Sequence, residues 1–395
     1  MFPSRLNHCA RALLPMLLAL SLLASCGGGV DSGGTGAPAA YALGPVSGFG
    51  SIIVNGVRFD DSTAVIQDDD GTLRSRDQLK LGMVTEVDAS DFKLNAGKES
   101  ATASSIRIVS DIIGPVGAVD PRAASLTVLG QTVLVTAATV FDANLPGGLA
   151  GVAVASVVEV HGRYDAARGR YTATRIERRT DAALYKLRGP VSAIDPVAKT
   201  LVIGGQTISY TQLTSAPDAQ LGKLVRARLQ RTPENGVWIA VALDSGVSRL
   251  PDRDDAQVEG RITAWTSSRQ FSVDGIAVDA GSATFAGSEA AVQLGARVEV
   301  EGASSAGVLH ARVVKVEGDE SEANSSFELH GAIDTLDTAT KTFTVHGVSV
   351  DYSGPVQFES GSASDLAPGR RVQVQGTLSP DGERIQALSI LFEGT

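Results

Sequence analysis

The clearest pattern in the chain is an apolar alternation that changes phase across a two-residue turn. In SIIVNGVRFD, residues 51–60, apolar side chains occupy alternate positions on both sides of Asn55-Gly56. A two-residue loop would place Val54 opposite Val57 and bring the apolar side chains of both strands to one face. Asn-Gly tolerates the positive φ angles of a type I′ turn. The stretch therefore predicts a tight β-hairpin.

The same arrangement recurs four more times along the chain. The later turn pairs, each between alternating apolar residues, are Leu129-Gly130, Gly204-Gly205, Asp274-Gly275 and His346-Gly347. A bulky residue disfavours positive φ, so the turn at Leu129 could be of another type. Each unit begins with a glycine. It ends with two strands, the first of which reads, for example, Val-Glu-Val. The opening glycines are Gly44, Gly114, Gly189, Gly260 and Gly331.

The repeat length is about 70 residues with about five strands in each unit. We place modules 1 to 5 at 41–111, 112–181, 182–248, 249–320 and 321–395. An opening glycine lets the first strand bend and serve two neighbours, and closure of a barrel hides exposed strand edges. The predicted fold is all-β, a tandem array of about five small OB-like antiparallel β-barrels. A plain antiparallel sandwich is the alternative.

The N-terminus has the features of a targeting segment. Arg5 and Arg11 precede a short apolar stretch, residues 13–23, which is too short to span a membrane. The segment ends in Leu-Ala-Ser followed by Cys26, and this resembles the lipobox of bacterial lipoproteins. The resemblance implies a signal peptide over residues 1–25, cleavage before Cys26 and lipidation of Cys26.

The alternative is an ordinary secretory signal with a chance cysteine. Residues 26–40, rich in Gly, Ser and Ala, are predicted to form a flexible tether. Gly27 follows the cysteine where lipoproteins of the inner membrane often carry Asp, so the resemblance implies a lipid anchor in the outer membrane, facing the periplasm or the cell surface.

Charge and cysteine content narrow the possible partners. The formal net charge is −10, and loss of Arg5 and Arg11 with the signal would make it −12. Such a surface repels phosphate backbones, so nucleic acid is not an expected partner.

The cysteine content excludes a disulfide in the processed chain. Cys9 would leave with the signal, and a lipidated Cys26 could not form a disulfide, so stability must come from packed cores.

The repeats resemble a known family. The GFGSIIVNGVRFD stretch at residues 48–60, the G-x-V openings and the V-x-V-x-G strands are similar to the domain of unknown function 5666, which occurs as tandem copies in bacterial lipoproteins. The resemblance covers nearly all of residues 41–395. It is strongest in module 1 and looser in module 3, where residues 225–228 lack the following glycine. It implies no activity and no functional residues.

One local patch interleaves basic and aromatic residues and is the candidate ligand-binding site. Its members lie in module 2 and are Arg163, Tyr164, Arg170, Tyr171 and Arg175. An anionic glycan or a lipid head group would suit such a patch in the cell envelope. The alternative is a surface hairpin whose arginines lie against acidic neighbours.

Signals for metals and catalysis are weak. His330 and His346 could approach each other, but no third ligand accompanies them. The run Asp68–Asp70 could hold calcium, yet it lacks the spacing of an EF-hand and is more typical of a solvated loop tip. No G-x-S-x-G elbow occurs. We expect no metal, no cofactor and no catalytic residue.

These observations predict a lipid-anchored envelope protein that is not an enzyme. Its tandem β modules would serve as a scaffold or a binding array for envelope proteins or glycans. The alternative function is an envelope protein that binds a glycan or a metal through the loops of its β modules, because those loops differ in length between the modules.

Overall fold

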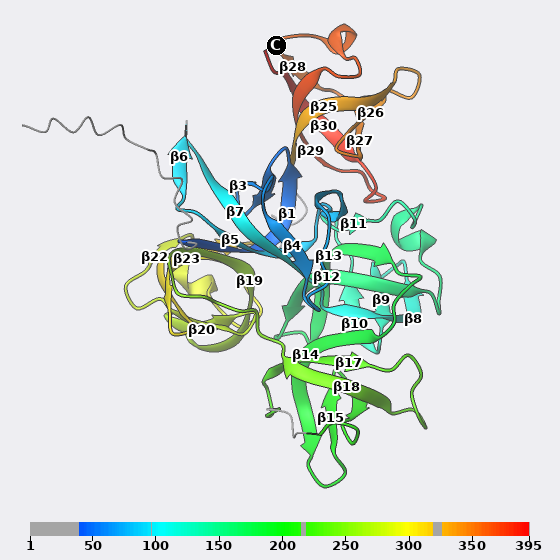
Figure 1. Cartoon of the computed structure of the whole chain (residues 1–395), viewed down its shortest axis with the longest axis vertical. Coiled ribbons are helices and arrows are strands. Elements are labelled where there is room, and N and C mark those ends of the chain that lie inside the picture. Colours follow the sequence, from blue (N-terminus) through cyan, green and yellow to red (C-terminus); the bar gives the residue numbers. More distant parts are fainter. Residues whose placement is uncertain (1–38, 96, 215–218, 319–325, 395) are drawn as a thin grey trace, which may run out of the picture. The chain divides into compact units, whose positions relative to one another are not determined.

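The computed structural model describes residues 39–95, 97–214, 219–318 and 326–394. The predicted signal peptide, Cys26 and the tether up to residue 38 lie outside the described residues. The described chain is all-β, and its only helical turns are four short 3-10 segments (Figure 1). None of its described helices has the length and apolar character needed to cross a bilayer.

Modules 1 and 2 have the same order of elements, except that module 1 has the additional short strand β6. Module 1 contains β1 Ala40–Phe49, β2 Ile52–Val54, β3 Val57–Asp60, β4 Val65–Asp68, η1 Arg76–Gln78, β5 Val84–Ala89, β6 Lys93–Asn95 and β7 Lys98–Val109. Module 2 contains β8 Ile112–Asp120, β9 Ser125–Val128, β10 Gln131–Leu134, β11 Val140–Phe141, η2 Gly148–Gly151, β12 Val157–Asp165 and β13 Arg170–Arg178.

Modules 3 to 5 repeat this order with small variations. Module 3 contains β14 Tyr185–Asp195, β15 Thr200–Ile203, β16 Gln206–Ser209, β17 Leu224–Leu229 and β18 Trp238–Ser245. Module 4 contains β19 Arg253–Ser267, β20 Gln270–Val273, β21 Ile276–Asp279, β22 Thr284–Ala286, η3 Glu289–Ala291, β23 Arg297–Ser305 and β24 Val308–Glu317. Module 5 contains β25 Phe327–Asp337, β26 Thr342–Val345, β27 Val348–Asp351, β28 Gln357–Glu359, η4 Ala363–Asp365, β29 Arg371–Leu378 and β30 Ile385–Phe392.

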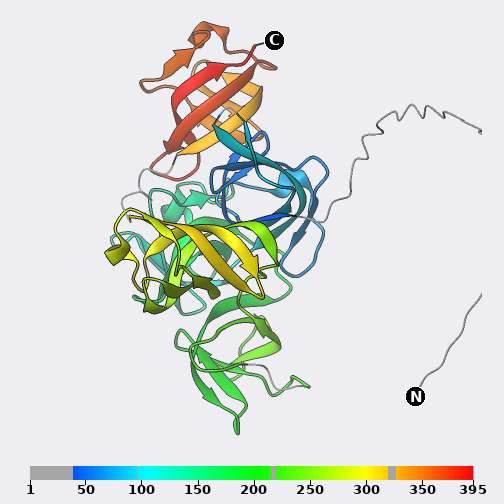
Figure 2. The same ribbon diagram turned by 90° about the vertical axis from the view of Figure 1, so that its left-hand side faces the viewer.

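Each module closes into a barrel by the same circuit of strand pairs. In module 1 the circuit is β1-β2-β3-β7-β5 and back to β1. The corresponding circuits are β8-β9-β10-β13-β12, β14-β15-β16-β18-β17, β19-β20-β21-β24-β23 and β25-β26-β27-β30-β29. Figure 2 shows the barrel of module 5, in orange and red, from the side. The predicted OB-like barrels are confirmed, and the sandwich alternative is excluded.

The circuits depart from a purely antiparallel pattern at one pair, and the short strands β4, β11, β22 and β28 add a second parallel pairing in their modules. In every module the third strand of the circuit runs parallel to the fourth, as β3 does to β7. This fourth strand of the circuit is the last strand of the module in chain order. The chain must cross from one end of the barrel to the other between these two strands. In module 1 this crossing is made by the variable connection after β3 and by β5. A purely antiparallel meander would not need it.

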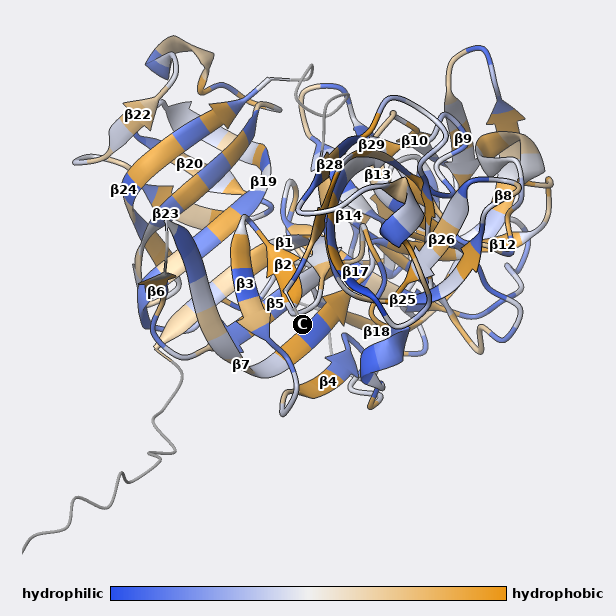
Figure 3. Ribbon diagram, turned by 90° about the horizontal axis from the view of Figure 1, so that it is seen from above, coloured by the Kyte–Doolittle hydropathy of each residue, from blue (hydrophilic) through white to orange (hydrophobic). Residues whose placement is uncertain are grey.

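The predicted hairpins have the expected register. Ile52 pairs with Phe59 and Val54 pairs with Val57, and all four side chains are at most 1% exposed. Both residues of all five turns have positive φ, as a type I′ turn requires. The alternation is visible in Figure 3, where β20, β23 and β24 carry successive orange and blue bands. One face of each hairpin therefore fills its barrel.

The turn at Leu129 is of the same type as the others, so the suggestion of a different type is wrong. Leu129 has φ 46° and is buried. A Cβ on Gly114 would lie only 2.4 Å from Leu129 Cγ. The glycine therefore leaves room for the leucine side chain, and burial of that side chain offsets the unfavourable backbone angle. Asn55, Asp274 and His346 lie over their own opening glycines in the same way.

Gly114→Ala is expected to lower the free energy of unfolding by about 1–3 kcal/mol, because the added methyl would overlap Leu129. Combining it with Leu129→Gly should cost less than the sum of the two single changes, since the second change removes the overlap. Urea unfolding followed by circular dichroism would measure both effects. Purely additive losses would contradict the proposed fit.

The opening glycines lie where the first strand changes partners. In module 1, residues 40–45 pair with β5 and residues 46–48 pair with β2. In module 4, residues 253–261 pair with β23 and residues 262–267 pair with β20. The glycine thus marks the bend that lets one strand serve two sides of a barrel, as predicted.

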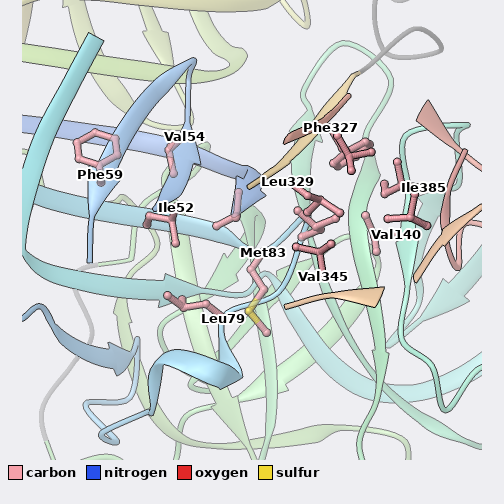
Figure 4. Close-up of a cluster of buried hydrophobic side chains, with 14 of the residues drawn as sticks. Ile52, Val54, Phe59, Leu79, Met83, Val140, Phe327, Leu329, Val345 and Ile385 are labelled. Atoms are coloured by element: carbon pink, nitrogen blue, oxygen red, sulfur yellow. The ribbon is translucent and has the colours of Figure 1, made fainter. Parts of the chain in front are cut away.

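Strand pairing also continues between modules that are distant in sequence. β1 pairs in parallel with β19 of module 4 and with β25 of module 5, and β8 pairs antiparallel with β14. One apolar cluster is formed largely by modules 1 and 5 and includes Ile52, Phe59, Leu329 and Ile385 (Figure 4). A second is shared by modules 2 and 3. The barrels therefore share edges and cores.

Candidate functional site

The β12–β13 hairpin carries the basic and aromatic residues singled out in the sequence, but they do not form an exposed patch. Tyr171 is fully buried in the apolar cluster of modules 2 and 3. Arg163 and Arg175 are 5% and 4% exposed. Tyr164 and Arg170 are partly buried. Neighbouring modules cover the hairpin, so the three buried residues offer no exposed surface, and ligand binding by the hairpin stays a prediction.

Arg163 points from module 2 to an acidic residue of module 4. Its Nη2 lies 2.6 Å from Glu259 Oε1, and Arg297 Nη2 reaches the same oxygen at 2.6 Å. Glu259 is 9% exposed. Burial alone would raise the pKa of Glu259, but the two guanidinium groups outweigh burial and lower it. The carboxylate therefore stays ionised and connects two modules.

A cavity of about 270 Å³ adjoins this ion cluster. Its charged lining includes Arg163, Glu259, Arg297, Glu299 and Lys315. The charges are of both signs, and the basic side chains of the lining form ion pairs with its carboxylates. Arg163 and Arg297 are engaged by Glu259, and Lys315 is engaged by Glu299 and Glu317. The lining of the cavity is better suited to holding modules together than to chemistry.

Glu299 is the one carboxyl of this cluster with a strongly raised pKa. Burial raises the pKa of Glu299 to about 7, and the nearby carboxylates of Glu259 and Glu301 act in the same direction. Lys315 Nζ lies 3.5 Å from Glu299 Oε2 and opposes the shift only in part. Glu299 lies directly opposite Glu259 on the neighbouring strand. The folded chain therefore holds a proton here near neutral pH.

Glu299→Gln is expected to remove part of the pH dependence of stability. The folded pKa of about 7 exceeds the ordinary value of 4.5, so the folded state binds more protons between these values. Stability should therefore fall as the pH rises from about 4.5 to 7, and stay lower above pH 7. The variant should gain on the order of 2–3 kcal/mol at pH 8 and little at pH 4.

Urea unfolding at pH 4, 6 and 8 in a Trp238→Phe background would measure this, with Trp265 fluorescence reporting on module 4. Glu359→Gln, at an exposed position of module 5, is the control and should leave the pH dependence of that signal unchanged. Equal pH profiles for Glu299→Gln and the unmodified protein would contradict the assignment.

Arg175 and Tyr171 likewise bind neighbouring backbone and acids. Arg175 Nη2 lies 3.2 Å from Asp142 Oδ2, and Arg175 Nη1 donates to Leu81 O of module 1 at 3.2 Å. The Tyr171 hydroxyl donates to the backbone oxygen of Arg188 in module 3. These two predicted site residues therefore attach module 2 to modules 1 and 3.

The aspartate run Asp68–Asp70 is engaged by cations of the protein. The Asp69 side chain is 1% exposed, forms an ion pair with Lys186 and lies 3.0 Å from Arg226 Nη1, both in module 3. Asp68 is paired with Arg74 at 2.7 Å. Neither the calcium alternative nor the solvated loop tip describes this loop, since its central carboxylate is buried against two cations.

A further buried cluster connects modules 1, 3 and 4. Arg188 is 6% exposed, and its Nη1 lies 2.9 Å from Asp111 Oδ1. Its Nη2 donates to the backbone oxygen of Asp274 at 3.1 Å, and its Nε donates to the oxygen of Gly246. Burial raises the pKa of Asp274 to about 6. Sequence reasoning missed this cluster, although Arg188 directly precedes an opening glycine.

His346, His330 and His161 each have their own hydrogen-bond or ion-pair partners. His346 Nε2 donates to the backbone oxygen of His330 at 2.8 Å, and His330 lies between Glu328 at 2.7 Å and Glu393 at 3.2 Å. His161 is fully buried with Nδ1 donating to Val109 O at 2.7 Å. Within the described residues, no group of three or more His, Cys, Asp or Glu side chains is placed to hold a metal ion.

Comparison with known families identifies the repeat. The family model described as Domain of unknown function (DUF5666) matches residues 113–177, 188–243, 259–318 and 330–390, more than half of the chain. The chain belongs to the DUF5666 family. The four matched ranges fall in modules 2 to 5, and each holds most of one barrel of the DUF5666 type. No curated protein was found to match the chain.

Module 1 lies outside the four DUF5666 matches, although the resemblance was expected to be strongest there. Its strands nevertheless follow the same circuit. It also differs in detail, since Ala89 stands at the bulge where Gly162, Gly302 and Gly376 stand in modules 2, 4 and 5. The barrel is thus retained where the sequence signature is weaker.

Proposed function

We propose that this protein is a lipid-anchored scaffold of the cell envelope, without catalytic activity, that presents an array of β modules to envelope partners. The observation that carries this proposal is the set of buried ion pairs between modules. Asp69 with Lys186, Arg163 with Glu259 and Arg188 with Asp111 all join residues of different modules. Such pairs fix how one barrel meets another, because separating them would leave buried charges without partners.

A string of independent barrels would not need these contacts. Flexible linkers would suffice to connect the barrels, and outward-facing side chains would remain solvated. Here charged side chains on barrel exteriors are buried against other modules, and strand edges are paired between modules. A fixed array offers partners a constant surface, which suits a scaffold.

Membrane attachment forms the second half of the proposal. The lipobox-like end at Cys26 and the tether over residues 26–40 would hold the array at a membrane, and Gly27 favours the outer membrane. Several acyl chains at about 0.8 kcal/mol for each buried methylene would make the attachment stable. Partners would then be envelope proteins or glycans, and nucleic acid would be excluded by charge.

Lipidation is tested by expressing the full chain in a Gram-negative bacterium with a radiolabelled fatty acid. The expected result is label on the protein and its recovery in outer-membrane vesicles, with both lost in Cys26→Ala. Cys9→Ala is the matched control and should behave like the unmodified chain. An unlabelled protein, or a labelled Cys26→Ala variant, would overturn the anchor. Crosslinking in intact cells followed by identification of captured envelope proteins would test the scaffold role, which fails if the protein is never captured with a partner.

A further inference from the structure

Module 4 carries an exposed tryptophan whose ring is held in one orientation. Trp265 lies near the end of β19 and is 47% exposed. Its indole Nε1 donates to Val292 O at 2.8 Å, so the ring cannot turn freely. Leu294 beside it is 43% exposed. An exposed aromatic ring fixed by a hydrogen bond contributes little to the core, yet presents a ready contact surface.

The ring forms one wall of a shallow hollow of about 620 Å³. All of its lining residues belong to module 4, in β19, the turn after it and the segment around η3. They are Trp265, Ser268, Glu289, Ala290, Val292, Gln293 and Leu294. The volume lies within the range of about 300–1,000 Å³ found for small-molecule sites. The hollow thus combines apolar and hydrogen-bonding groups in one concave surface.

The charge in this hollow is already compensated. Glu289 Oε2 lies 3.0 Å from Arg269 Nη2, and Glu289 Oε1 accepts a hydrogen bond from Ser268 Oγ at 2.9 Å. Gln293 is exposed and donates from Nε2 to Ala290 O at 2.9 Å. A charged ligand would find no unmatched opposite charge at Glu289. The lining therefore favours a neutral ligand with both apolar and hydrogen-bonding faces.

A second cleft of about 630 Å³ shares one wall with this hollow. Leu294 lines both, and the cleft also receives the aromatic ring of Tyr164 from β12. Its acidic group Asp244 is paired with Arg228 at 3.3 Å. The lining of this cleft also includes Lys223 and the hydroxyl-bearing residues Ser245, Thr263 and Ser272. An extended ligand could follow this surface.

We propose that the surface around Trp265 binds a neutral oligosaccharide. A sugar ring has an apolar face of C–H groups that can stack on an indole, and hydroxyls at its edge that can bond to Ser268 and Gln293. Ser268 and Gln293 each have one partner within module 4 but can form further hydrogen bonds, and purely apolar side chains would cover this capacity without using it. This inference deepens the proposed function, whose partners include glycans, and rests on that binding role but not on lipidation.

The test uses the full chain purified in detergent, titrated with chitohexaose, cellohexaose and maltohexaose. Trp265 is exposed and Trp238 is 9% exposed, so protection of the fluorescence from iodide quenching reports mainly on Trp265. Binding of at least one of these sugars is expected, with protection of Trp265. Calorimetry with the same sugar should show at least a tenfold loss of affinity in Trp265→Ala and a smaller loss in Leu294→Ala.

Leu73→Ala is the matched control, because Leu73 is 73% exposed in module 1 and lines neither hollow. It should bind the sugar as the unmodified protein does. Circular dichroism should show that all variants remain folded. Failure of all three sugars to bind at millimolar concentration, or equal binding by Trp265→Ala, would overturn the proposal. Binding of dextran sulfate or an apolar peptide at Trp265 instead would overturn the ligand class, and each of these results would leave the lipid anchor unaffected.

Discussion

Asp69→Ala is expected to lower the free energy of unfolding by about 3–5 kcal/mol. The change removes the buried carboxylate from Lys186, which is 3% exposed, and from Arg226. Lys186 would keep Ser110 Oγ at 3.2 Å and Asp70 at 3.5 Å, and neither replaces the close contact with Asp69. An ammonium group in that position can be neither well solvated nor fully paired, so the folded state loses stability.

The effect should appear in a module other than the one that is changed. Asp69 belongs to module 1, whereas Trp238 in module 3 packs against Tyr185, which directly precedes Lys186. Urea unfolding followed by Trp238 fluorescence, in a Trp265→Phe background, would measure the shift in module 3. If the modules were independent, the Trp238 midpoint would stay unchanged, and this would contradict the fixed array.

A matched control and a rescue make the result specific. Asp181→Ala removes an ion pair with Arg179 in which the aspartate side chain is 77% exposed, so its effect should stay below about 1 kcal/mol. Adding Lys186→Met to Asp69→Ala should recover part of the loss, because the unpaired ammonium is then gone. If the double variant lost more stability than the two single variants lose together, this would contradict the direct pairing of Asp69 and Lys186.

The barrels could be predicted because their signals are local. A type I′ turn needs two residues with positive φ next to each other, and the phase change of the apolar pattern follows directly from a two-residue loop. The register of Val54 with Val57 is fixed by these few residues. The opening glycines also act within one module. Each of these features therefore appears in the sequence at a constant spacing.

The burial of the candidate site could not be predicted in the same way. Alternation in β12 places Val158 and Val160 inside the barrel and Glu159, His161 and Arg163 outside it, yet all five are at most 8% exposed. An outward position on a barrel is exposed only if no other module covers it, and such coverage depends on contacts between residues far apart in the chain. β23, in contrast, alternates between buried and partly buried residues.

One signal could have indicated the covered faces. Arg188 and Glu259 stand directly before the opening glycines of modules 3 and 4, and both are buried in ion pairs. A charge at the bend of a first strand is costly unless a partner is provided. A charged residue directly before an opening glycine would thus have pointed to a contact with another module, as Arg188 has with Asp111 and Glu259 has with Arg163.

Tyr171→Ala is expected to cost about 3–5 kcal/mol of stability. The ring is fully buried and packs against Tyr164 with ring centroids 5.1 Å apart. Its hydroxyl donates to Arg188 O, so the change leaves both a cavity and an unpaired carbonyl group at the contact of modules 2 and 3. Tyr171→Phe keeps the ring and should cost only about 1–2 kcal/mol.

The two variants separate a structural role from a ligand-binding role for this tyrosine. Urea unfolding followed by Trp238 fluorescence would measure the loss of stability in both variants. The control is Arg170→Ala, at the neighbouring partly buried position, and its expected loss is smaller than that of Tyr171→Phe. If Tyr171 served a ligand at the surface, Tyr171→Ala would leave the unfolding midpoint unchanged and lower only binding. Burial of the whole side chain predicts the opposite, because a ring that solvent does not reach can contact a ligand only after modules 2 and 3 have separated.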